Sequence, residues 1–157
     1  MDQDTDAWLQ PLADLVEKQQ GQGGILLTMP DFRPDLTRVI ADRLGFAFFD
    51  FRADILMPLG WEAAKVTLDQ LTDALAERAL DGGVVAHNVE ALLATKEPVA
   101  RQGWLERFSI DPWPHPVIVP MFLFSEEVQF LSPNVLHFTE RDLPEETLLG
   151  QLRFWGS

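Results

Sequence analysis

The sequence predicts a three-layer α/β/α fold in which helices cover both faces of a mainly parallel, five-stranded sheet. Short apolar runs alternate along the chain with segments whose apolar residues recur at helical spacing, a pattern typical of β-α-β units. The 157 residues fit one domain, so we expect a single domain over residues 1–157. Apolar residues make up 46% of the sequence, enough to form a core without disulfides or a structural metal.

The first third of the chain alternates between helix and strand. Apolar residues at helical spacing predict an amphipathic N-terminal helix over about residues 6–20. The glycines that follow break this helix, and Ile25–Met29 is a short apolar run suited to a buried strand. Helical spacing returns over residues 36–44 until Gly45 provides a stop, and the aromatic run Phe46–Phe51 predicts a second strand.

The middle of the chain continues this alternation. A helix is expected over roughly Glu62–Leu80, and Val84–Ala86 follows as a third strand. We expect this strand and Ile25–Met29 to be central in the sheet and buried on both faces, because both runs are continuously apolar. Pro98 is placed to begin another helix, and the proline-rich stretch 111–116 predicts an ordered loop that is not helical.

The last part of the chain predicts two further strands and a helix. Val117–Phe124 is the most apolar segment, and Pro120 inside it predicts an irregularity or a break in strand pairing. Asn134–Phe138 can add a fifth strand. Asp142 is placed to cap a last helix, and we expect no C-terminal lid domain because the chain has no room for one.

Composition excludes several classes of function. Cysteine is absent, which removes disulfides, thiolate catalysis and iron–sulfur sites. The acidic start is unlike a secretory signal and no apolar run approaches the ~20 residues of a membrane span, so we expect a cytoplasmic protein without membrane association. With 25 acidic against 12 basic residues the formal charge is -13, which repels a phosphate backbone, and we expect no direct nucleic-acid binding.

The loop after the first strand is the place where P-loop proteins hold nucleotide phosphates. Their motif, G-x-x-x-x-G-K-[ST], supplies backbone amides, a lysine and a hydroxyl. The corresponding stretch here is Met29-Pro30-Asp31-Phe32-Arg33-Pro34-Asp35-Leu36. Met29 and Pro34 replace the two glycines, Asp35 replaces the lysine and Leu36 replaces the hydroxyl residue. Asp31 and Asp35 place negative charge where a phosphate needs a cation.

The end of the third strand also lacks the residues that its motif requires. Val84–Leu93 resembles the Walker B segment of AAA-type ATPases, in which two acids hold the Mg²⁺ shell and orient water. His87 and Asn88 stand at those positions, and neither suits that hard cation. They could serve as a base and its orienter, but we favour a hydrogen-bonded structural pair. Glu90 and Glu97 could join His87 at a metal, yet no metal-binding motif supports this, and we expect no metal or cofactor.

From about residue 24 to residue 152 the order of segments resembles the ASCE/AAA branch of P-loop ATPases. Val117–Phe124 stands in the position of the strand that carries sensor residues. The resemblance implies a P-loop-like sheet, although the diagnostic motifs match in spacing and not in identity. Among P-loop proteins without a lid, the chain is similar to a degenerate BrxF, the small P-loop component of BREX phage-defence systems. That resemblance implies a place in a bacterial defence or DNA-processing assembly.

These observations leave three hypotheses of function. The one we favour is a non-catalytic pseudo-ATPase that acts as a structural or regulatory subunit and contacts a protein partner or copies of itself. The second is a nucleotide-binding protein or ATPase with an altered site, in which Arg33 and Arg38 replace the missing lysine. The third is an acidic inhibitor that occupies a DNA-binding groove of a partner. The candidate interface residues are Phe32, Arg33 and Trp113, and we expect Trp113 to be exposed because prolines hold its loop away from regular packing.

Overall fold

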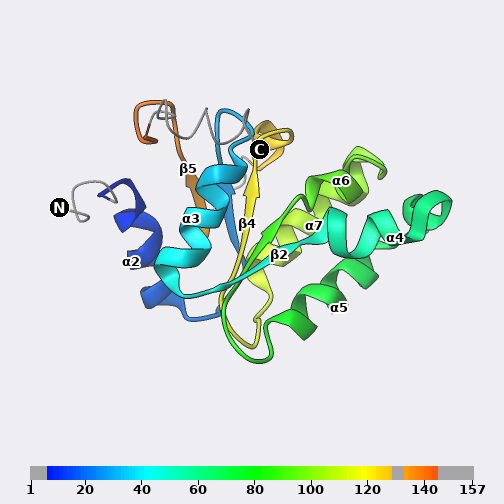
Figure 1. Cartoon of the computed structure of the whole chain (residues 1–157), viewed down its shortest axis with the longest axis horizontal. Coiled ribbons are helices and arrows are strands. Elements are labelled where there is room, and N and C mark those ends of the chain that lie inside the picture. The colour runs from blue at the N-terminus through cyan, green and yellow to red at the C-terminus, as the bar shows by residue number, and fades with distance from the viewer. Residues whose placement is uncertain (1–6, 129–132, 145–157) are drawn as a thin grey trace, which may run out of the picture.

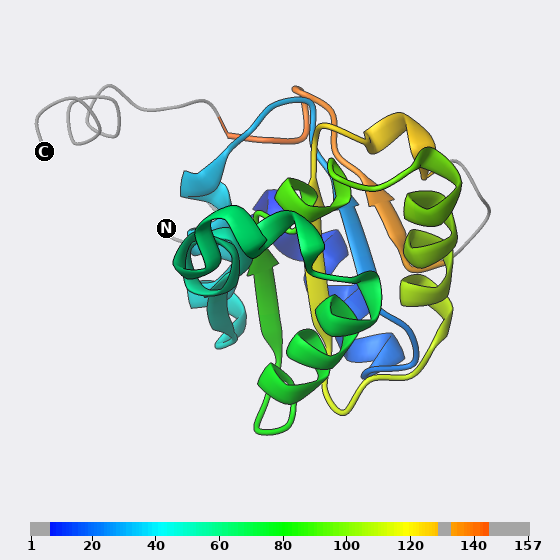
Figure 2. The same cartoon turned by 90° about the vertical axis from the view of Figure 1, so that its right-hand side faces the viewer.

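The computed structural model describes residues 7–128 and 133–144, and the five strands of this part form one all-parallel sheet (Figure 1). The strand order is β2-β3-β4-β1-β5, and Figure 2 shows β3, β4, β1 and β5 side by side. Helices cover both faces, so the predicted three-layer α/β/α fold is confirmed. The strands are β1 (Ile25–Thr28), β2 (Ala47–Asp50), β3 (Val84–His87), β4 (Val117–Met121) and β5 (Val135–His137).

The strands β1 and β3 lie inside the sheet, and every residue of both is buried. Ile25 belongs to the hydrophobic cluster on one face, whereas Leu26 belongs to the cluster on the other. Val84 and Val85 divide between the same two clusters. The predicted interior position of these runs is confirmed, because a strand covered by helices on both faces has no polar side.

Two helical layers enclose the sheet (Figure 1). One layer holds α2 (Gln10–Gln19), which follows the 3₁₀ turn η1 (Ala7–Leu9), and α3 (Pro34–Leu44). The opposite layer holds α5 (Leu68–Arg78), α6 (Glu90–Leu93) and α7 (Pro98–Ile110). The expected helix start at Pro98 is confirmed, α3 begins at Pro34, and Gly45 ends α3 in the left-handed region with φ 69°.

The connection between β2 and α5 differs from the prediction. The helix expected over Glu62–Leu80 begins only at Leu68, because Thr67 and Gln70 form a capping box in which each side chain accepts from the other's backbone N–H. Three short elements precede it: the π-helical turn η2 (Arg52–Leu56), α4 (Met57–Leu59) and the 3₁₀ turn η3 (Gly60–Lys65). The segment around α4 projects from the body of the domain (Figure 1).

Pro120 interrupts the pairing of β4 on one side. Toward β1 the strand pairs as far as Met121, whereas toward β3 the pairing stops at Ile118. The Met121 carbonyl faces β1 and accepts from the Met29 N–H at 2.7 Å, so the backbone of Pro120 faces β3, where proline has no N–H to donate. The predicted break in pairing is confirmed, and β4 ends earlier than predicted, before the 3₁₀ turn η4 (Ser125–Glu127).

The C-terminal part of the chain is described as far as Pro144. The strand expected over Asn134–Phe138 is β5, which pairs with β1. The Asp142 carboxylate accepts from the Thr139 N–H at 2.7 Å and from its hydroxyl at 2.9 Å, and the helix that Asp142 was expected to cap lies outside the described residues. Within residues 7–128 and 133–144, no helix combines the length and apolar character needed to cross a membrane.

Candidate functional site

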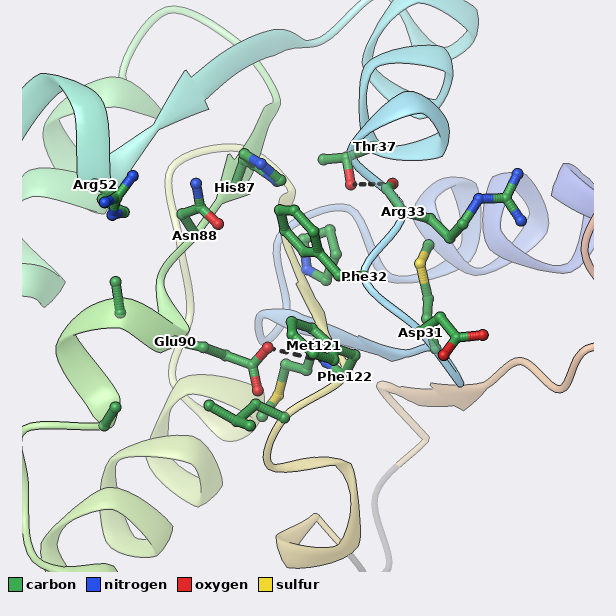
Figure 3. A pocket seen from close by; sticks show the side chains of 15 residues that line it. Asp31, Phe32, Arg33, Thr37, Arg52, His87, Asn88, Glu90, Met121 and Phe122 are labelled. Atoms are coloured by element: carbon green, nitrogen blue, oxygen red, sulfur yellow. Dashed lines mark hydrogen bonds between the residues drawn. The ribbon is translucent and has the colours of Figure 1, made fainter. Parts of the chain in front are cut away.

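A pocket of about 350 Å³ opens at the carboxyl edge of the sheet, where β1, β3 and β4 end. The chain leaves β1 toward α3 on one face and leaves β3 toward α6 on the other. The two connections separate over the end of β4, and open α/β sheets bind ligands in crevices of this kind. Figure 3 shows Phe32 and Phe122 on one side of the pocket, Arg52 and Asn88 on the other, and Glu90 between them.

The loop between β1 and α3, which the sequence comparison aligns with the P-loop motif, forms one wall of the pocket. Met29 and Leu36 stand where the motif has its first glycine and its hydroxyl residue, and both side chains are buried in the cluster beneath α3. Pro34 opens α3 and so offers no N–H at this helix end. Asp35 occupies the first turn, where its charge suits the helix dipole in place of a phosphate. None of these four positions presents a group that would hold phosphate.

An ion pair closes the N-terminus of α3. The Arg33 Nε and Nη2 bind the two Asp35 carboxylate oxygens at 3.1 and 2.9 Å, and Nη1 donates to the Pro144 carbonyl at 3.1 Å. Burial raises the pKa of Asp35, but the Arg33 guanidinium and the Leu36 amide outweigh burial and keep this pKa below its ordinary value of 3.8. Arg33 is therefore engaged by Asp35 and by the Pro144 carbonyl, and its role as an interface anchor or as a replacement for lysine stays a prediction.

His87 lies in an aromatic stack at the floor of the pocket. Its ring centroid is 5.5 Å from that of Phe32 and 5.4 Å from that of Phe48, and Phe32 also contacts Phe122 at 5.4 Å. Burial lowers the pKa of His87, which Asp50 opposes and Arg38 reinforces. The imidazole is therefore neutral near pH 7, and the Phe32 ring stacks on it.

Asn88 does not pair with His87. Its backbone is in the left-handed region, with φ 62°, and its Nδ2 donates to Asp50 Oδ1 at 3.3 Å. The same Asp50 oxygen accepts from the Ala53 N–H at 3.0 Å, where the chain turns into η2. The favoured His87–Asn88 hydrogen-bonded pair is thus wrong, because the left-handed turn directs the amide of Asn88 toward β2.

Glu90 holds the loop after β4 in place. It is buried, and its two carboxylate oxygens accept from the Phe122 N–H at 2.9 Å and the Phe124 N–H at 2.7 Å. Burial raises the pKa of Glu90 above 4.5, although these amides work in the opposite direction. Sequence reasoning considered Glu90 only as a metal ligand, and the described residues contain no cluster of three or more side chains that could hold a metal ion.

A second charged contact fixes the same loop. Arg101 binds both Glu127 carboxylate oxygens at 2.8 and 2.9 Å, and its guanidinium lies 4.0 Å from the Phe124 ring centroid. Its Nη1 also donates to the Lys96 carbonyl at 3.1 Å. The wall that carries Phe122 is therefore anchored by two nearly buried charged groups, Glu90 and Arg101.

Trp113 is buried, which corrects its expected exposure. Only 9% of it is accessible, its Nε1–H donates to the Phe108 carbonyl at 3.1 Å, and the two ring centroids are 5.2 Å apart. Its backbone N–H donates to Gly21 at 2.8 Å, so the rigid loop turns its tryptophan into the core. Phe32, the other aromatic candidate for the interface, is 49% exposed. Trp61, which sequence reasoning did not single out, is 98% exposed.

The cation that lines the pocket without a partner is Arg52, which the sequence did not single out. Arg38, proposed as a replacement for lysine, lies with its guanidinium 4.1 Å from the Phe48 ring centroid and is not part of the pocket wall. Arg52 begins η2 and is exposed, and within the described part of the chain its guanidinium has no hydrogen bond, ion pair or ring contact.

No protein-family model, curated protein or solved structure matches this chain.

Proposed function

We propose that this chain is a non-catalytic protein of P-loop-like fold, a pseudo-ATPase, that acts as a structural or regulatory protein-interaction module. The observation that carries this proposal is the closed phosphate position at the start of α3. The Arg33–Asp35 ion pair occupies the helix end that would receive a phosphate, and Phe32 lies over His87. A nucleotide would have to break this ion pair and displace the ring, and it would gain neither a lysine nor a Walker B acid.

The strand order supports the P-loop-like part of the proposal. β4 lies between β1 and β3, between the strands that end in the degenerate phosphate loop and in His87. The resemblance to ASCE/AAA ATPases assigns β4 the role of the sensor strand, and the resemblance to BrxF suggests a bacterial defence or DNA-processing assembly as the setting.

The projecting segment around α4 is the surface we propose for docking. Met57, Leu59 and Trp61 are all exposed, with Trp61 almost fully accessible. Isolated exposed apolar residues are ordinary, but here three of them occur close together in the sequence of one short projecting segment. Tryptophan is among the side chains that most often anchor interfaces, so Trp61 takes the place that sequence reasoning gave to Trp113.

Calorimetry with Mg²⁺-ATP tests the non-catalytic part of the proposal. We expect no saturable heat at millimolar nucleotide, because the described residues offer no phosphate ligand at the start of α3. A dissociation constant below 100 μM, on the order of −5.5 kcal/mol, would refute it.

Trp61→Ala tests the interaction surface. Co-purification from the native host, followed by reconstitution from two purified proteins, identifies a partner, and light scattering detects self-association. Trp61→Ala should weaken the reconstituted complex or the oligomer without changing thermal stability. Ile110→Ala, an exposed apolar residue of α7, is the matched control and should leave binding unchanged. Equal binding by wild type and Trp61→Ala would contradict docking through this segment.

A further inference from the structure

The pocket at the carboxyl edge of the sheet contains polar groups that the described part of the chain leaves unused. The guanidinium of Arg52, an exposed residue, has no partner there. His87 is only 7% exposed, and neither ring nitrogen has a hydrogen bond within the described residues. No side-chain nitrogen or oxygen without a partner is fully buried among those residues, so the His87 nitrogens retain access to solvent beside the pocket that His87 lines.

The remaining wall of the pocket is apolar. Phe32, Phe122 and Leu123 are exposed large side chains of its lining, which also includes the small side chains of Ala91 and Ala94. Glu90 and Arg101 hold the loop that carries Phe122, so this wall is preformed. At about 350 Å³ the pocket lies near the lower end of the range for ligand sites, roughly 300–1,000 Å³. A pocket of this size suits a ligand with one small apolar body, such as a single ring or a short branched chain.

The charges in the pocket determine which polar group a bound ligand could carry. Arg33 is engaged by Asp35, and the Glu90 oxygens are engaged by two amides, which leaves Arg52 as the unengaged cation of the lining. His87 can add a neutral N–H donor. Asp31, which also lines the pocket and is exposed, disfavours multiply charged anions. One guanidinium with one imidazole therefore suits a single carboxylate, and it does not suit the accumulated charge of a triphosphate.

We infer that this pocket binds a carboxylate carried on a small apolar body, with Arg52 and His87 at the carboxylate and Phe32, Phe122 and Leu123 around the body. This chemistry has two sources, a free aromatic or branched-chain organic acid and the C-terminal residue of a peptide. The inference does not depend on the proposed docking through Trp61, because the two surfaces use different residues.

Titration calorimetry of the full chain with matched probes tests this inference. The probes are 3-phenylpropionate, its neutral amide, and a short peptide ending in phenylalanine with a free or an amidated C-terminus. Both carboxylates should bind more tightly than their amides, by about tenfold, because the amide removes the charge that Arg52 recognises. Tighter binding of the free-ended peptide would assign the site to a protein terminus, and tighter binding of the small acid would assign it to a metabolite.

Two substitutions locate the binding. Arg52→Gln should weaken carboxylate binding about tenfold or more, whereas Arg107→Gln, at an exposed arginine of α7 outside this pocket, should not change it. Ala94→Phe should block binding by filling the space, and circular dichroism checks that this variant is folded. The inference is overturned if neither carboxylate binds at 10 mM (~2.7 kcal/mol), if acids and amides bind equally, or if Arg52→Gln binds as wild type does.

Discussion

Replacing Trp113 by alanine tests the reassignment of this residue from the surface to the core. The indole is nine-tenths buried, packs against the Phe108 ring and donates to the Phe108 carbonyl. That carbonyl also accepts from the Gly24 N–H at 2.7 Å, so it keeps a partner when the indole is removed. The cost of Trp113→Ala is therefore mainly the lost packing and the cavity left behind.

Removal of a buried tryptophan costs about 3–5 kcal/mol. For a chain of this length each kcal/mol lowers the thermal midpoint by about 2–4 °C, which gives an expected drop of about 6–20 °C. Thermal denaturation followed by far-UV circular dichroism measures this change.

Trp61→Ala is the matched control, because it makes the same chemical change at a side chain that is 98% exposed. Its effect should stay within about 0.5 kcal/mol. Equal midpoints for the two variants, or a drop for Trp113→Ala of less than about 3 °C, would show that Trp113 is not a core residue.

Five other substitutions, at four positions, probe packing and charge. Gly24→Ala should lower the free energy of unfolding by about 1–3 kcal/mol, because its Cβ would overlap the ring of Phe108. In Gly103→Ala, within α7, the new Cβ meets no atom within 4 Å, so this variant should raise the free energy of unfolding by about 0.5–1 kcal/mol. Urea unfolding compares the two variants. Burial raises the pKa of Glu90 above 4.5. The stability that its protonated form contributes is therefore present below about pH 4.5 and is lost as the pH rises through the folded-state pKa. Glu90→Gln should flatten this pH dependence, which unfolding curves measured across these pH values would show. Arg101→Ala should cost about 3–5 kcal/mol in the same assay and Arg101→Lys should recover only part of it, because lysine cannot make the two-pronged contact with Glu127.

The fold could be predicted because its signals are local. The continuous apolar runs of β1 and β3 indicate burial on both faces, and Pro34 and Gly45 mark the two ends of α3. The late start of α5 also had a local signal, since Thr67 followed by Gln70 matches a capping box. The sequence before Thr67 continues the apolar spacing of a helix, and this spacing concealed the start of α5.

The site could be predicted only in part, because its decisive contacts join distant segments. The absence of a lysine and of a hydroxyl residue at Asp35 and Leu36 can be read from the sequence, since the positions compared with the P-loop motif are contiguous. The roles of Glu90 and Trp113 are not, because Glu90 reaches amides of the loop after β4 and Trp113 packs on α7. An acid within the apolar run 89–93 was the available signal for Glu90, since a buried carboxylate requires hydrogen-bond donors.

The position of the pocket follows from topology and does not require the residues of a nucleotide site. The connections after β1 and β3 run to opposite faces of the sheet, so a crevice opens over β4 whatever side chains line it. Phe32, His87 and Asn88 line this crevice and help to set what it can hold. Among the described residues, its lining combines the rings of Phe32 and Phe122 with one unengaged guanidinium, that of Arg52. The proposed absence of nucleotide binding and the proposed carboxylate site are therefore compatible in one fold, and the nucleotide and carboxylate titrations test them separately.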